Sequence, residues 1–241
     1  MLTGAAVLAV SSSLSGPAVA QDISINFGQG AGLTERVIQL IALITVLSLA
    51  PSILVMMTSF TRIVVVLSLL RTALGTGTAP PNAVIVALAL FLTAFVMGPA
   101  FQNAYDTGVR PLLNNEITTE QAFERAAGPF RTFMLKNVRE KDLALFLDMS
   151  REAKPATPEE VSLRILVPAF MISELRRAFE IGFLLFLPFL IIDLVVASVL
   201  MSMGMMMLPP VVVSLPFKLI FFVLVDGWTL VAGSLIQSYG T

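Results

Sequence analysis

The chain has no cysteine and no histidine among its 241 residues. Disulfide bonds, thiolate nucleophiles and imidazole acid–base chemistry are therefore excluded, and so are metal sites built from Cys and His ligands. No catalytic motif stands in their place. We expect a protein that is not an enzyme and that needs neither a cofactor nor a bound metal.

Charge is also scarce. Charged residues make up 13% of the chain and hydrophobic residues 56%, with a mean hydropathy of +0.89. A soluble domain carries about 25% charged residues, and several uncharged runs of about twenty residues are long enough to cross a membrane as helices. The sequence predicts an all-α membrane protein made of kinked apolar helices and helical hairpins. The net charge of −1, without a basic patch, predicts no nucleic-acid partner.

Residues 1–20 are predicted to form a cleavable signal peptide. Ala18-Val19-Ala20 fits the small-x-small pattern before Gln21, although no basic residue precedes the apolar stretch. Residues 21–36 are expected to be an external N-terminal stub.

Residues 37–104 are predicted to form a first apolar hairpin. Its first run reaches residue 57 and contains Pro51, which is expected to kink the helix; its second run, residues 83–97, is expected to close at Gly98-Pro99. Arg62 and Arg71 are the charges between the two runs, and by the positive-inside rule they predict a cytoplasmic loop there.

Residues 105–164 hold most of the charged residues and are predicted to form a hydrophilic helical insert on the periplasmic side. Segments 116–136 and 141–153 have the periodicity of amphipathic helices. Their apolar stripe is expected to pack within the insert or against an identical neighbour.

Residues 165–241 are predicted to form a second apolar hairpin, which carries isolated charges. Each charge facing lipid would cost about 2.5–3.5 kcal/mol, and seven would cost about 20 kcal/mol, more than a typical fold can spare. The charges must therefore face protein or water, as salt bridges between helices or subunits or as an ion or proton pathway. Within one helix, the spacing favours the pairs Glu174–Arg177 and Arg176–Glu180. The seven residues are Glu174, Arg176, Arg177, Glu180, Asp193, Lys218 and Asp226.

A methionine-rich turn, residues 201–210, separates two long apolar segments of this hairpin. Gly204 loosens the backbone, and Pro209-Pro210 prevents a helix from continuing. Methionine side chains are flexible and repack at little cost, which suits either a filler of an apolar turn or a seal that opens and closes. The turn contains Met201, Met203, Met205, Met206 and Met207.

Several contiguous stretches resemble signatures of the FliP family of flagellar biosynthesis proteins. They are PAFMISELRRAFEIGF at 168–183, PFLIIDLVV at 188–196, the methionine-rich turn, LPFKLIFFVLVDGW at 215–228 and PSILVMMTSFTRI at 51–63. The resemblance extends from about residue 40 to the C-terminus and is weakest in the hydrophilic insert.

The resemblance implies a subunit of the flagellar type III export gate in the bacterial inner membrane, within the flagellar basal body. In that family, a pentameric ring joins FliQ and FliR, with FlhB and FlhA nearby, and unfolded flagellar proteins pass through the pore. The methionine-rich turn would be the constriction of this pore, sealed by a ring of thioether side chains. Phe133 and Phe146 would contact neighbouring copies, and the buried charges would form ion pairs that hold the ring.

Two other classes of protein remain as alternatives. A proton-coupled secondary transporter could use Asp193 and Asp226, although the chain shows no internal duplication of the kind that transporters often have. An intramembrane protease would need a Ser–Lys site or a pair of aspartates, and the residues after Asp226 give no independent support for one.

Overall fold

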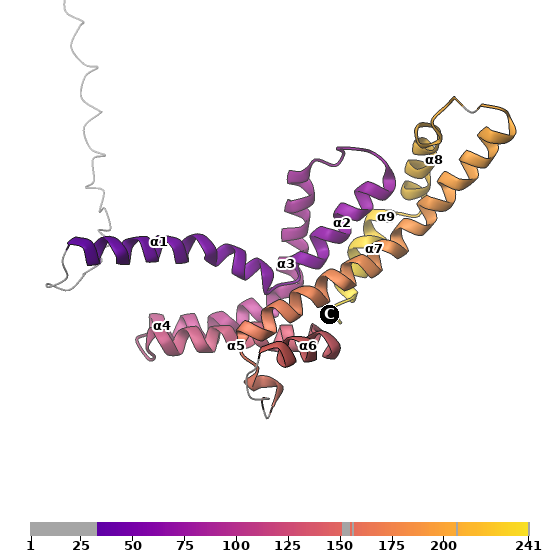
Figure 1. The fold of residues 1–241 in the computed structure, drawn as a ribbon. Helices are drawn as coiled ribbons and strands as arrows, with labels where there is room; N and C mark the ends of the chain where they lie inside the picture. Colours follow the sequence, from indigo (N-terminus) through magenta and orange to yellow (C-terminus); the bar gives the residue numbers. More distant parts are fainter. Residues whose placement is uncertain (1–32, 151–154, 156, 206, 241) are drawn as a thin grey trace, which may run out of the picture. The chain divides into compact units, whose positions relative to one another are not determined.

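We describe the fold from a computed structural model, which defines residues 33–150, 155, 157–205 and 207–240. All the regular elements in these ranges are helical (Figure 1), which confirms the predicted all-α class. The predicted signal peptide lies outside the described residues. The chain divides into two compact units, residues 1–47 and 48–241. The described part of the first unit belongs to α1 (Leu33–Met56); the rest of this section concerns the second unit.

The core of the second unit is built on α7 (Leu163–Ser202), a single helix of 40 residues. In Figure 1, α2 (Phe60–Leu74) lies beside the middle of α7, and α3 (Asn82–Ala104) lies against α2. The insert helices α5 (Thr119–Asn137) and α6 (Glu140–Ser150) pack on the first half of α7, which follows the short 3-10 turn Pro158–Glu160. Helix α8 (Pro210–Leu224) returns along the last part of α7 and is followed by α9 (Gly227–Gln237).

Two apolar clusters hold these helices together. The first lies among α2, α3, α7, α8 and α9 and includes Ile63, Leu70 and Phe189. The second joins α5 and α6 to α3 and α7 and includes Met134 and Phe170. Helix α7 contributes to both clusters, so it connects the apolar hairpins to the hydrophilic insert.

Within the described ranges, two helical segments are long and apolar enough to cross a membrane, Asn82–Leu113 and Leu163–Ser202. Helices α8 and α9 together would make a third, bent by 63° at its break. The chain bends here because Asp226, between the two helices, adopts a left-handed backbone conformation with a φ of 49°.

One predicted boundary is wrong. The second apolar run does not end at Gly98-Pro99, because α3 continues through both residues to Ala104 and leads into a π-helical turn, Tyr105–Val109, and the short α4, Arg110–Leu113. A proline removes one N–H donor, and the helix on both sides keeps its other hydrogen bonds.

The insert helices lie close to the predicted ones. Helix α5 begins with a capping box, in which the Thr118 hydroxyl accepts a hydrogen bond from the Gln121 N–H and the Gln121 side chain accepts one from the Thr118 N–H.

Candidate functional site

The methionine-rich turn forms the end of the α7–α8 hairpin (Figure 1). Helix α7 stops because Gly204 has a φ of 74°, a conformation that residues with a Cβ rarely adopt. The N–H of Gly204 donates to the Met201 carbonyl at 3.1 Å and the N–H of Met205 donates to the Leu200 carbonyl at 3.0 Å. This is the two-bond pattern of a Schellman motif. Pro209 and Pro210 then start α8.

The methionine side chains of this turn are open to their surroundings. Met201, Met203 and Met205 are 58%, 55% and 46% exposed, and Met207 is 99% exposed. Met206 lies outside the described residues. Four apolar, flexible side chains are thus presented together at the end of the α7–α8 hairpin, without a covering element in the described chain.

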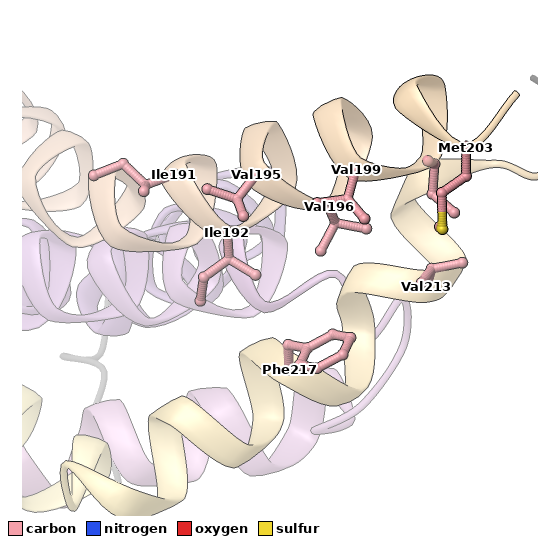
Figure 2. A pocket seen from close by; sticks show the side chains of 9 residues that line it. Ile191, Ile192, Val195, Val196, Val199, Met203, Val213 and Phe217 are labelled. Carbon is pink, nitrogen blue, oxygen red and sulfur yellow. The ribbon is translucent and has the colours of Figure 1, made fainter. Parts of the chain in front are cut away.

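Behind the turn, α7 and α8 enclose an apolar groove of about 460 Å³ (Figure 2). Val196 on α7 faces the groove opposite Phe217 on α8, and Met203 lies at its turn end. The two helices are therefore not closely packed near the turn, and this end of the hairpin has free volume into which side chains can move.

Farther from the turn, a largely buried ion pair joins α7 to α8. The Lys218 ammonium donates to Asp193 Oδ2 at 2.7 Å and to the carbonyl of Ala73, at the end of α2, at 3.2 Å. The Ser214 hydroxyl donates to Asp193 Oδ1 at 2.6 Å. Lys218 is only 4% exposed. Two of the seven charges singled out in the sequence thus meet directly, whereas Asp226 lies exposed at the α8–α9 bend.

A second buried pair joins α2 to α7. Arg62 Nε donates to Glu174 Oε2 at 2.9 Å, and Nη2 of the same guanidinium contacts Oε1, which makes the pair bidentate. The remaining nitrogen, Nη1, donates to the hydroxyl and the carbonyl of Ser238. The Tyr239 hydroxyl donates to Glu174, and the guanidinium carbon lies 3.8 Å from the centre of the Tyr239 ring.

Arg62 does not lie in a loop as predicted, because it belongs to α2, is only 3% exposed and has its charge neutralised inside the protein; the cytoplasmic side stays a prediction. The signal in the sequence was its isolation in an apolar helix, which indicates a buried partner. Tyr239, the other residue that sequence reasoning missed, has no comparable signal. Burial and the nearby Glu174 carboxylate raise the pKa of the Tyr239 phenol, so its hydroxyl stays protonated and serves as a donor.

The expected pairs within α7 are replaced by others. Glu174 pairs with Arg62, and Arg177 lies 3.9 Å from Glu180 instead. Arg176 lies 3.9 Å from Asp142 of α6. Because α2 and α6 bring oppositely charged groups against α7, contacts between helices engage Glu174 and Arg176, and the pair that remains within α7 is Arg177–Glu180.

Phe133 and Phe146 both pack inside the chain. The Phe133 ring lies 5.9 Å from that of Phe170 and is stacked at 5.7 Å on that of Tyr239. Phe146 packs against the second core cluster. Both rings remain partly exposed, and their contact with a neighbouring copy stays a prediction.

Within the described ranges, Asp and Glu residues form no group of three that could hold a metal ion. The chemistry of the site thus lies in an uncovered apolar turn and in two buried ion pairs that fix the helices behind it.

Comparison with known proteins places these features in a family. A family model described as "FliP family" matches residues 43–235, which include the methionine-rich turn and both buried ion pairs. The chain belongs to the FliP family. Tyr239 lies beyond the matched segment.

Relatives in the family match over most of their length. The chain is 66% identical over 217 residues to a flagellar biosynthetic protein FliP of Caulobacter vibrioides, covering 90% of this chain and 82% of the relative. It is 50% identical over 244 residues to the protein of the same name from Rhizobium meliloti, covering 99% and 100%. The Bacillus subtilis protein of this name is 55% identical over 202 residues, covering 84% of this chain and 91% of the relative.

Proposed function

We propose that the chain is a subunit of the flagellar protein export gate, located in the bacterial inner membrane with its insert on the periplasmic side. Membership of the FliP family supports this function, as do relatives named for flagellar biosynthesis and helices long enough to cross a membrane. The proposed activity is passage of unfolded flagellar proteins, without bond chemistry.

In this proposal, five copies form a ring with FliQ and FliR, next to FlhB and FlhA, and the methionine-rich turns converge on its axis. The observation that carries the proposal is the exposure of the turn's methionines at the end of a hairpin. A ring of copies would bury these four large apolar side chains against one another at the end of the hairpin.

Methionine has the physical properties that such a seal requires. Its unbranched side chain has three rotatable bonds, so a ring of thioethers closes on itself when the pore is empty and spreads around a passing chain. An apolar constriction also excludes water and ions. The seal would therefore admit polypeptides of many sequences and still block leakage.

A proton-coupled transporter is less well supported by the geometry. Asp193 is bound by both Lys218 and Ser214, so it is not a free carboxylate along a pathway, and Asp226 lies at a helix break.

The test is ionic leakage in cells that assemble the gate. We expect M205A/M207A to assemble and to raise ion conductance across the membrane above background, because the shortened side chains leave a water-filled opening. The triple variant M205A/M206A/M207A should leak more. The matched control is M56A/M149A, which removes two exposed methionines elsewhere. Assembled rings of the turn variants with background conductance would show that the seal lies elsewhere.

A further inference from the structure

A second cavity, of about 610 Å³, lies between the end of α5, the middle of α7 and the segment that follows α9. Its rim carries Lys136, Arg139 and Arg177, and Ile181 and Leu184 form an apolar side. The cavity thus lies where the charged insert meets the apolar half of α7.

The rim has an excess of positive charge. Arg139 lies 3.4 Å from Glu180 and Arg177 lies 3.9 Å from the same carboxylate, so one acid is shared by two guanidinium groups. Lys136 has no acidic partner in the described part of the chain. Arg62 also borders the cavity, but Glu174 neutralises it. Three cations therefore face one carboxylate.

One of the positive residues has its backbone held in place, and the guanidinium groups remain accessible. The backbone N–H of Arg139 donates to the Ser173 hydroxyl of α7 at 3.1 Å, which fixes the start of α6 against α7. The side chains of Arg139 and Arg177 are 34% and 55% exposed. An anion entering the cavity would meet accessible guanidinium donors.

An exposed apolar track leads away from the cavity along α7. Leu184, Ile191 and Val195 are 65%, 59% and 57% exposed and lie seven and four residues apart, on one face of the helix. At 1.5 Å per residue the track is roughly 16 Å long, about half the thickness of a bilayer's hydrocarbon core. It ends at the apolar α7–α8 groove, which Ile191 and Val195 also line (Figure 2).

We propose that this cavity binds an anionic phospholipid, with the phosphate among Lys136, Arg139 and Arg177 and an acyl chain along the α7 track. Basic pockets beside membrane helices attract acidic headgroups. The apolar track selects a lipid over a free phosphate, because a free phosphate would use only the basic rim. The site is distinct from the methionine-rich turn and does not depend on the proposed seal.

The experiment uses the full chain, purified in detergent and incubated with equal amounts of phosphatidylglycerol and phosphatidylcholine. Native mass spectrometry then counts the lipid that stays bound. The cavity variant is K136Q/R139Q/R177Q. The matched control, R110Q/R125Q/K141Q, removes the same charge from exposed insert residues outside the cavity. Circular dichroism checks that both variants remain helical.

We expect the native chain to retain more phosphatidylglycerol than phosphatidylcholine. In the cavity variant this preference should fall by at least about tenfold, while the control variant should keep it. Excess inorganic phosphate should displace little of the bound lipid. Equal loss in both variants, or no preference in the native chain, would overturn the proposal. Complete displacement by inorganic phosphate would also overturn it, because that result would indicate a simple anion site.

Discussion

Replacing Arg62 with methionine should lower the stability of the chain more than any single substitution on its surface. Arg62 and Glu174 are 3% and 0% exposed, and all three guanidinium nitrogens have partners. Methionine fills much of the same volume but leaves the Glu174 carboxylate with the Tyr239 hydroxyl as its remaining side-chain donor. The variant therefore tests the cost of an unpaired buried charge and not the cost of a cavity.

The expected magnitude is large. Removing one partner of a buried ion pair costs about 3–5 kcal/mol, out of a total stability of about 5–15 kcal/mol. At about 2–4 °C per kcal/mol for a chain of this size, the melting temperature should fall by roughly 6–20 °C. The double variant R62M/E174L removes both charges together, and replacing a buried pair by apolar residues is often neutral or stabilising. It should recover most of the loss.

The assay is thermal unfolding of the purified chain in detergent, followed by circular dichroism and by the fluorescence of Trp228, the only tryptophan. The matched control is R110M, at an exposed arginine, which should melt within about 2 °C of the native chain. If R62M melts like this control, the pair does not stabilise the fold. If R62M/E174L is as unstable as R62M, the unpaired charge is not the cause of the loss.

Three further predictions concern contacts between helices. Charge reversal in K218D should abolish assembly of the gate, because Asp193 then faces a second carboxylate, and D193K/K218D should restore part of it; loss with both variants would count against the pairing. Y239F removes one donor to Glu174 and should lower stability by about 1–3 kcal/mol in the same melting assay, and an unchanged melting temperature would refute that role. G108A should destabilise the chain, because a Cβ there would lie 2.8 Å from the Ala122 carbonyl and 2.7 Å from the Ala126 Cβ. In G128A the added Cβ has no atom within 4 Å, so the stability of the chain should rise by up to about 1 kcal/mol. If G128A were less stable than G108A, the close contact of Gly108 with α5 would be contradicted.

Local signals were enough to predict the break that creates the methionine-rich turn. Gly204 supplies the left-handed residue that ends α7, and Pro209-Pro210 supplies the start of α8. Both effects depend on the backbone of the residue itself, so no tertiary contact is needed to see them. The insert helices were predictable for a similar reason, since their apolar residues recur at helical spacing.

Pairing across the fold could not be predicted in the same way. Arg62 and Glu174 are separated by 112 positions, and several cations were available to Glu174, including Arg177 three residues along its own helix. Which cation reaches it depends on how α2 crosses α7, and that crossing follows from the apolar core. The sequence therefore indicated that the isolated charges are buried and paired, but not which residues form each pair.

The two buried pairs divide the α7–α8 hairpin into a fixed part and a free part. Lys218 ties α8 to α7 and to the end of α2, and Tyr239, beyond α9, ties the end of the chain to α2 and α7. On the turn side of Ser214, whose hydroxyl donates to Asp193, α7 and α8 are separated by an apolar groove and most of their outer side chains are exposed. A movement of the hairpin end that carries the methionine-rich turn would therefore disrupt few packed contacts and would break neither ion pair. A hairpin built in this way can shift at its tip while its base stays in place, which is the mechanical behaviour that a seal opened by a passing chain requires.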